Sequence, residues 1–390
     1  MIKFGFRESL LYPGLFVLFL AIRRIVKFFL EIYLLEKKLS YILVLIMFIF
    51  EIVIGFIFLH HRNRKEVSPI TSEFLGIPLK QKANCLKRPD SNLKVVILIL
   101  LASYFEMIGV ISRRCLTLNS SSNKSNLYDE YHAKLRSSEI IIASLLCLFT
   151  LKIKIYRHHT FSLIIILICL VVIFITSFIC EKDFYIYCIL ILVSSIARVF
   201  LDTIEKYLFT VDFVDIYKIT IVEGVIDTFL TCFLFLFDEP NEELMNLVNN
   251  TIDNEDKPKN FIYWVGIFFL LVYGALSGLK NIYRRYTVKL YSPMTRALAE
   301  SILDPFFIIY GYVDKNKDGS QEELISFIIT LVCSFLMVFC SCVYNEIFVL
   351  YCFGLERNTH LYVLHTNSNL ELTENNNKNS SLEEDLNSDI

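Results

Sequence analysis

Long apolar runs alternate along the chain with shorter polar or basic connections. A helix rises about 1.5 Å per residue, so about 20 apolar residues are needed to cross a hydrocarbon layer about 30 Å thick. The pattern therefore predicts an all-α, polytopic membrane protein with ten transmembrane helices. We expect these helices at residues 10–35, 41–59, 95–111, 136–154, 161–179, 184–209, 213–237, 261–279, 291–312 and 325–352.

The expected helices form two groups of five, separated by a short polar break at residues 181–183. In each group the longest connection precedes the third helix. We expect residues 1–182 to form a first five-helix repeat and residues 183–362 a second. Residues 363–390, rich in Asn, Ser and Glu, are expected to be a disordered, polar and acidic cytoplasmic tail.

An internal match supports this division. Residues 21–35 and 195–209 each end the first helix of their group, and their alignment pairs Arg24 with Arg198. Because each repeat has an odd number of helices, the two repeats must cross the membrane in opposite directions. Inverted repeats are found in many secondary transporters, which bind their substrate near the bilayer midplane.

The fourth expected helix carries a narrow stripe of polar and small residues. Its members are Arg136, Glu139, Ala143, Cys147, Thr150 and Lys154. They recur at spacings of three and four, so they share one helix face. A membrane helix packs such a stripe against other helices or against a water-filled cavity, and both alternatives stay open.

Motifs in both groups resemble a known family. Arg136-Ser-x-Glu-Ile-Ile-x-x-x-Leu-Leu, followed by a basic stretch and Tyr156-Arg-His, is similar to the fourth helix and turn of the drug/metabolite transporter (EamA-like) superfamily. Further segments that resemble it are residues 204–208, 221–224, 277–284, 292–299, 344–347 and 353–359. Residues 277–281, Ser-Gly-Leu-Lys-Asn, are the nearest analogue of the Gly-Ala-Leu-Asn-Lys motif of GDP-sugar carriers, in a different order.

The branch that the chain resembles most is the nucleotide-sugar-transporter-like solute carrier 35 group. The resemblance spans about residues 10–360. It implies the same ten-helix fold, a nucleotide-sugar-like substrate, and a location in the Golgi, the endoplasmic reticulum or another endomembrane.

Ionisable residues inside membrane helices are expensive, about 2.5–3.5 kcal/mol each on insertion scales. They therefore pair with one another or line a pathway. The candidate substrate contacts are Glu51, Glu106, Arg136, Glu139, Glu223, Asp227, Arg296 and Glu300. We expect Arg136 and Arg296 to offer a guanidinium fork to an anionic group, and the carboxylates to meet polar groups or protons. The alternative is a set of interhelical ion pairs with no role in transport.

Two rows of charges follow single helices. Arg198, Asp202 and Lys206 are spaced by four, so the acid can meet a base on either side along one face, and we interpret this row as structural. Glu223 and Asp227 are also four apart, with no base one turn away. This pair favours a shared proton or a cationic partner from another helix.

The distribution of Lys and Arg near helix ends favours cytoplasmic termini. In this orientation, two loops on the opposite side of the membrane contain candidate glycosylation sites at Asn119, Asn123 and Asn249.

Composition excludes several classes of function. The net charge of −2 gives no attraction to nucleic acid, and 55% hydrophobic residues exceed the roughly 45–50% of soluble domains. Most of the 11 Cys lie in apolar runs without a Cys-x-x-Cys pair, so we expect neither a metal nor a cofactor. The pairs His60–His61 and His158–His159 lack helical ligand spacing and are expected to anchor helix ends at the membrane interface. We find no acid/base cluster of a membrane-embedded enzyme.

The sequence as a whole favours a secondary transporter that moves a polar, anionic metabolite by alternating access. An organic cation or vitamin is the second candidate substrate, because acids outnumber bases in the middle of the expected helices. A membrane receptor or scaffold without transport is the alternative from another class. The expected partners are a small-molecule solute and membrane lipids, and a homodimer stays open.

Overall fold

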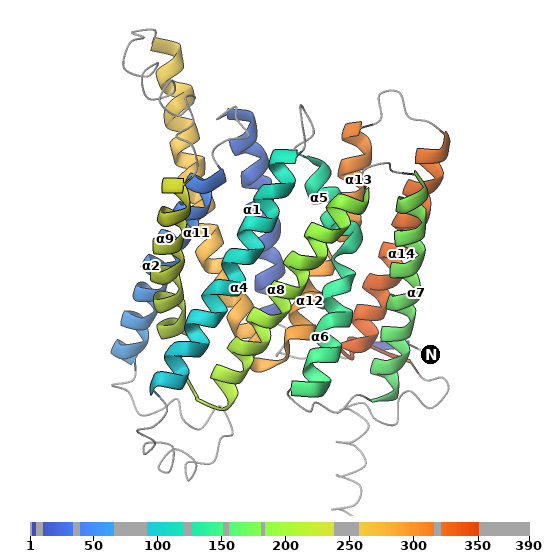
Figure 1. Cartoon of the computed structure of the whole chain (residues 1–390), viewed down its shortest axis with the longest axis horizontal. Coiled ribbons are helices and arrows are strands. Elements are labelled where there is room, and N and C mark those ends of the chain that lie inside the picture. Colours follow the sequence, from blue (N-terminus) through green and yellow to red (C-terminus); the bar gives the residue numbers. More distant parts are fainter. Residues whose placement is uncertain are drawn as a thin grey trace, which may run out of the picture.

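The computed structural model describes residues 2–4, 11–33, 40–65, 92–119, 126–150, 156–180, 184–237, 257–315 and 321–350. These residues form a bundle of helices with one pair of short strands (Figure 1). The all-helical expectation is therefore confirmed for the described part of the chain. The expected tail, residues 363–390, lies outside it.

The structure describes six helices in the first half of the chain. They are α1 (Leu11–Tyr33), α2 (Ser40–Lys65), α4 (Asn92–Asn119), α5 (Asn126–Leu135), α6 (Ser137–Thr150) and α7 (Arg157–Cys180). Those of the second half are α8 (Phe184–Thr210), α9 (Ile216–Phe237), α11 (Lys257–Leu290), α12 (Pro293–Ser301), α13 (Asp304–Lys315) and α14 (Gln321–Tyr344). Strand β1 (Ile2–Phe4) pairs antiparallel with β2 (Phe348–Leu350).

Six of the described helices are long and apolar enough to cross a membrane. Their apolar stretches are Leu43–Arg62, Leu93–Ser112, Arg157–Cys180, Tyr187–Thr210, Trp264–Leu290 and Leu324–Tyr344. Helices α1 and α9, which carry charged residues within their apolar runs, are not among the six. The chain is thus compatible with an integral membrane protein.

The ninth expected membrane helix is broken in two, which corrects the prediction of a continuous helix, and the fourth is preceded by a helix that was not expected, α5. A turn at Arg136 separates α5 from α6, and residues 302–303 separate α12 from α13. Pro305, the second residue of α13, explains the second break. Proline has no N–H to donate to the carbonyl of Ser301, and its ring clashes with that carbonyl in a continuous helix.

Glycines allow α2 to lie very close to α9 and α11. A Cβ atom on Gly224 of α9 would meet Ile52 at 2.8 Å, and one on Gly278 of α11 would meet the Phe50 carbonyl oxygen at 3.1 Å. Gly274 and Gly278 are four apart, a spacing of small residues that is typical of tightly packed membrane helices. This close approach brings polar residues of α11 within reach of α2.

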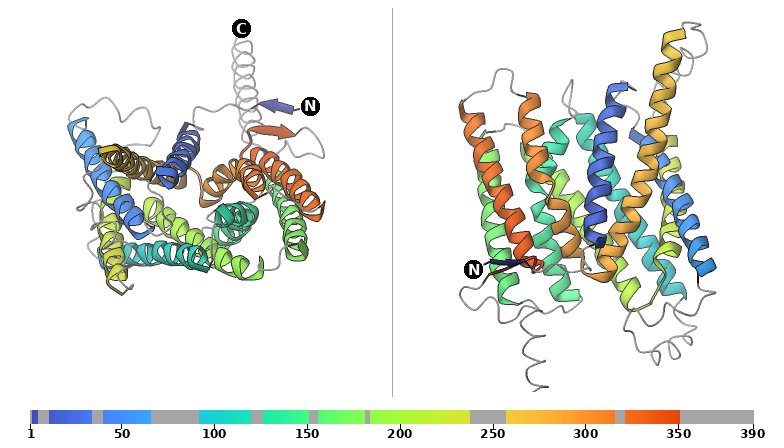
Figure 2. Two further views of the ribbon diagram at one scale, coloured as in Figure 1. Left: turned by 90° about the horizontal axis from the view of Figure 1, so that it is seen from above. Right: turned by 180° about the vertical axis from the view of Figure 1, so that it is seen from behind.

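The remaining helices pack in pairs. Helix α1 lies along α11 and α4 lies along α8, while α6 packs against α12 and α5 against α13. Viewed from above, α2 and α9 lie at one end of the bundle, and α7 and α14 lie at the opposite end (Figure 2). The broken helices connect these regions, since α5 and α6 pack on both α8 and α7, and α12 packs on both α8 and α14.

Apolar side chains cover the outside of the bundle. Phe149 is 73% exposed and Phe229 is 71% exposed, whereas the three largest fully buried side chains of the described residues belong to arginines. A soluble protein would arrange these residue types the other way round. The outer surface is suited to lipid, and the charged groups lie inside.

Candidate functional site

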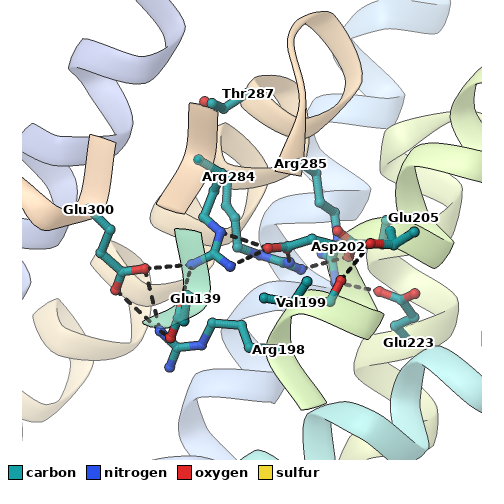
Figure 3. A network of polar contacts seen from close by, with 12 residues as sticks. Glu139, Arg198, Val199, Asp202, Glu205, Glu223, Arg284, Arg285, Thr287 and Glu300 are labelled. Carbon is teal, nitrogen blue, oxygen red and sulfur yellow. Dashed lines mark hydrogen bonds and ion pairs between the residues drawn. The ribbon is translucent and has the colours of Figure 1, made fainter. Parts of the chain in front are cut away.

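The buried arginines are Arg136, Arg285 and Arg296. An unpaired charge in the interior of a membrane protein is very unfavourable, so a buried arginine requires carboxylate partners. Each of the three has such partners, and two of them belong to a network that connects six of the described helices (Figure 3).

Arg285 of α11 joins carboxylates from three other helices. It forms ion pairs with Glu51 of α2, with Glu205 of α8 at 2.9 Å and with Glu223 of α9 at 2.5 Å. The side-chain amide of Asn281, one turn earlier on α11, donates to the second oxygen of Glu51 over 2.8 Å. One guanidinium group thus fixes α2, α8, α9 and α11 to one another.

Asp202 of α8 connects this group to a second one. One of its oxygens accepts from Arg284 of α11 at 2.5 Å, and the other accepts from Nε of Arg296 in α12 at 2.7 Å. Arg296 also donates to Glu139 of α6 at 2.8 Å and to Glu300, one turn along α12, at 2.9 Å. The network therefore extends from α2 to the broken helices.

Two cations at the α12 end are held more loosely. Arg198 of α8 lies 3.5 Å from Glu139 and 3.4 Å from Glu300, and its side chain is 19% exposed. Lys280 of α11 is partly exposed and makes neither a hydrogen bond nor an ion pair with any described residue. It lies within electrostatic range of Arg198, Arg23 and Glu300. Among the cations of this site, Arg198 and Lys280 therefore have the least neutralised charge.

Arg136 lies in the turn that breaks α5 from α6. It forms an ion pair with Asp304, the first residue of α13, at 2.8 Å. It also donates to the backbone carbonyl of Glu300 at 3.2 Å and contacts Nδ1 of His132 at 2.9 Å. The breaks in the two interrupted helices are thus tied to each other by one ion pair.

Three neighbouring carboxylates, one in the network and two beside it, have buried oxygens that lack a hydrogen-bond partner among the described residues. These oxygens are Oε2 of Glu106, Oε1 of Glu223 and Oδ1 of Asp227. Glu106 and Glu223 are both within electrostatic range of Asp227, which is 1% exposed. The cation expected from another helix reaches Glu223, through Arg285, while Asp227 Oδ1 has no donor among the residues that the structure describes.

The structure brings most of the predicted candidates together. Glu51, Glu139, Glu223, Arg296 and Glu300 belong to the network, Arg136 adjoins it through Glu300, and Glu106 and Asp227 lie beside it. The forks of Arg136 and Arg296 are occupied by protein carboxylates in this conformation. Of the candidate glycosylation sites, Asn119 is the last residue of α4, and Asn123 and Asn249 lie outside the described residues.

The row on α8 contains structural ion pairs, as interpreted from the sequence, but the partners of Asp202 lie on other helices. Asp202 pairs with arginines of α11 and α12 rather than with Arg198 or Lys206 of its own helix. Lys206 donates instead to the backbone carbonyls of Lys289 at 2.7 Å and Tyr291 at 2.8 Å. The row was therefore not a sequence of ion pairs along one face.

Sequence reasoning also missed Glu205, Asn281, Arg284 and Arg285. The expected helix ended at residue 279, so the two arginines were placed in a connection, whereas α11 continues to Leu290. A better signal was available, because the unbroken helical pattern of residues 280–290 contains neither Gly nor Pro.

No protein-family model matches the chain, and no curated protein matches it. The resemblance to the drug/metabolite transporters therefore stays an expectation from the sequence motifs alone.

Proposed function

We propose that the chain is a secondary transporter that moves a polar, anionic metabolite across an endomembrane by alternating access. One observation carries the proposal: a connected network of arginines and carboxylates is buried where the two sequence halves meet, inside helices with apolar outer faces. In membrane helices such ionisable groups mark solute or proton pathways.

The proposed architecture is ten spans in two inverted five-helix repeats, with the fourth span of each repeat formed by a broken helix. The helix packing supports it, since α1 lies along α11 as α8 lies along α4. In the same way, α12 packs on α6 in one place and α5 packs on α13 in the other. Helix α2 packs on its counterpart α9, and α7 packs on its counterpart α14. Discontinuous helices at a repeat interface are where such transporters bind their substrate.

Ion pairs between the halves would set the direction in which the site opens. Glu139 of α6 and Arg296 of α12 join the halves in the network, and Arg136 and Asp304 join them at the helix breaks. An ion pair can break at low cost when a charged group of the solute replaces one partner, because the other partner then keeps an opposite charge beside it. A solute that takes over such contacts would let one repeat move relative to the other.

The sign of the solute is inferred from the two loosely held cations. Arg198 has its nearest carboxylates at 3.4–3.5 Å, and Lys280 has neither an ion pair nor a hydrogen bond within the described part of the chain. A phosphate or another anion can complete both sets of charge-assisted hydrogen bonds. The nucleotide-sugar-like class and the endomembrane location rest on the family resemblance.

The test is uptake into liposomes that contain the purified protein, with nucleotide sugars, nucleoside phosphates and organic cations, each with and without a pH gradient. We expect saturable uptake of a nucleotide derivative. Lys280→Gln and Arg198→Gln should each reduce its kcat/KM about tenfold or more, since a hydrogen bond to a charged group contributes about 1.5–3 kcal/mol. Lys218→Gln, which removes an exposed lysine from α9, is the matched control and should retain full uptake.

Equal uptake by Lys280→Gln, Arg198→Gln and the control would contradict the proposed binding role of these cations. Absence of flux for every solute, with the protein folded, would favour a receptor or scaffold. In that case Glu139→Gln should change stability alone.

A specific observation favours an organic cation as the second candidate. The carboxylates of Glu106, Glu223 and Asp227 each have a buried oxygen that no described donor satisfies, and a positively charged amine could supply the missing donors. Uptake of a cation that is lost in Asp227→Asn and retained in Lys280→Gln would establish this function in place of anion transport.

A further inference from the structure

A separate cluster of possible metal ligands lies away from the charged network, where α7 begins and α14 has just ended. It consists of His158 and His159 in the first turn of α7 and Glu346 in the turn after α14. One ligand atom from each residue lies within 4.8 Å of the ligand atoms of the other two. The sequence separates the histidines from Glu346 by most of the second half of the chain, so only folding brings them together.

Among the three residues, His158 gives the strongest indication of a bound ligand. Its side chain is 3% exposed, and neither ring nitrogen has a hydrogen-bond partner among the described residues. Nε2 lies 3.6 Å from Oε1 of Glu346, which is too long for a good hydrogen bond. A buried imidazole without a hydrogen-bond partner is unfavourable. Two ligand atoms of one tetrahedral zinc ion lie about 3.4 Å apart, close to the separation of Nε2 and Oε1 here.

His159 and Glu346 can complete the site, because a ligand atom of each lies within 4.8 Å of the other ligand atoms. The His159 ring lies 4.0 Å from the His158 ring and stacks on Tyr344 at 4.2 Å, measured between centroids. Nδ1 of His159 accepts one long hydrogen bond of 3.3 Å from the Tyr156 amide. A metal at Nδ1 displaces this bond, and a metal at Nε2 requires the proton on Nδ1, so either mode sacrifices the same weak contact.

The backbone supports the position of the carboxylate. Glu346 has a φ angle of 57°, in the left-handed region that residues other than Gly rarely adopt. The turn is fixed by hydrogen bonds from the Glu346 amide to the Val343 carbonyl at 3.1 Å and from the Ile347 amide to the Cys342 carbonyl at 2.9 Å. Strand β2 follows directly and pairs with β1. The carboxylate is thus presented to the histidines from a defined turn.

We propose that His158, His159 and Glu346 bind one divalent transition-metal ion of the zinc class, with water completing the coordination. Two imidazoles and one carboxylate form a three-ligand set that suits Zn²⁺ and leaves the fourth position open. Because α7 packs on α14, the ion pins the first turn of α7 to the end of α14, and so joins the first half of the chain to the second.

The experiment uses the full-length protein, purified in detergent, freed of any affinity tag and stripped of metal. Zn²⁺ binding is measured by equilibrium dialysis with elemental analysis, and Co²⁺ is used as a second probe because its visible absorption reports nitrogen and oxygen ligands. We expect one Zn²⁺ per chain, a visible Co²⁺ band, and a rise of the unfolding temperature on addition of Zn²⁺.

The variants are His158→Gln and Glu346→Gln, with the double variant His60→Gln/His61→Gln as matched control. His60 and His61 are also adjacent at a helix end, but they are exposed and belong to no three-ligand group among the described residues. Loss of an outer-shell partner already weakens metal binding roughly 10–100-fold, so loss of a ligand should exceed this, while the control should bind as the wild type does.

Two results would overturn the proposal. One is a wild-type protein that binds no stoichiometric Zn²⁺ or Co²⁺. The other is binding that His158→Gln and Glu346→Gln leave intact, or that the control variant abolishes. Since His158 is buried and its replacement can impair folding, Glu346→Gln, in the turn outside the helices, provides the independent reading.

Discussion

Arg296 of α12 donates a hydrogen bond over 2.8 Å to Glu139 of α6, a residue from the other half of the sequence. The same guanidinium group is shared with Asp202 and Glu300. In an apolar environment the four groups stabilise one another, because removal of any one leaves a buried charge without its partner. The Arg296–Glu139 pair therefore links the two halves and is also part of a larger group of charges. The effects of substitutions at these four residues on stability should not be additive.

Asp202→Asn should destabilise the protein more than any single change at the surface. The substitution removes the charge that Arg284 and Arg296 share, and breaking a buried ion pair costs about 3–5 kcal/mol. The measurement is the free energy of unfolding in detergent micelles. Arg62→Gln, which breaks an exposed pair with Asp215, is the control and should cost less than about 1 kcal/mol. Similar losses for both variants would show that the network is not stabilising.

Much of the fold could be predicted from hydropathy, because membrane helices must satisfy their backbone hydrogen bonds internally and present apolar side chains to lipid. Helices α7 and α8 end within a few residues of their expected limits for this reason. The breaks were harder to predict. The apolar run around Ile302 and Leu303 continues through the interruption, and only Pro305 signals it.

The partners within the site could not be predicted from one sequence. Spacing along a helix identifies residues on one face, but it contains no information about which residue of another helix faces them. Asp202 has bases at both helical neighbours and yet binds Arg284 and Arg296, far away in sequence. By contrast, Arg296 and Glu300 lie four residues apart within α12, a spacing that allows an ion pair along one helix, and the structure contains that pair.

Gly278→Ala should force α11 away from α2. The new Cβ atom would lie 2.8 Å from Ile54 and 3.1 Å from the Phe50 carbonyl, and overpacking of this kind costs about 1–3 kcal/mol. The displacement should also weaken the contact between Arg285 and Glu51, one to two turns along α11 and beside Phe50 on α2.

The unfolding midpoint in detergent tests this prediction, with Gly14→Ala as control. Apart from its chain neighbours and its own helix backbone, no atom of the described residues lies within 4 Å of the position of a Cβ on Gly14, so that variant should be at least as stable as the wild type. An unchanged midpoint in Gly278→Ala would mean that α2 and α11 can separate without loss.

Glu223→Gln and Asp227→Asn should differ, although the two acids lie one turn apart on α9. Glu223 forms an ion pair with Arg285, and its neutralisation leaves a buried cation less compensated. Asp227 Oδ1 has no donor within the described part of the chain, so neutralisation of Asp227 should change stability by less than about 1 kcal/mol or increase it. Equilibrium unfolding of the two variants, compared at one pH, tests the difference, and equal destabilisation would contradict it.

Lys206→Met should loosen the junction between α11 and α12. The ammonium group of Lys206 donates to the carbonyls of Lys289 and Tyr291 at 2.7 and 2.8 Å, where α11 ends and its last carbonyls lack helical partners. Methionine has a similar length but no donor, and loss of hydrogen bonds from a charged group costs about 1.5–3 kcal/mol. The junction positions Ser292, whose side chain accepts from the Thr295 amide and begins α12, so Arg296 should also become more mobile.

Amide hydrogen exchange over residues 289–296, together with the unfolding midpoint, measures this effect. Lys218→Met, at an exposed lysine of α9, is the matched control and should leave exchange in this segment unchanged. Faster exchange in Lys206→Met alone would show that this lysine, which the sequence placed in a row of ion pairs, instead caps the helix that carries Arg284 and Arg285. Equal exchange in both variants would show that the two hydrogen bonds of Lys206 do not stabilise the junction. Ser292 and Pro293, which begin α12, would then be sufficient to hold it.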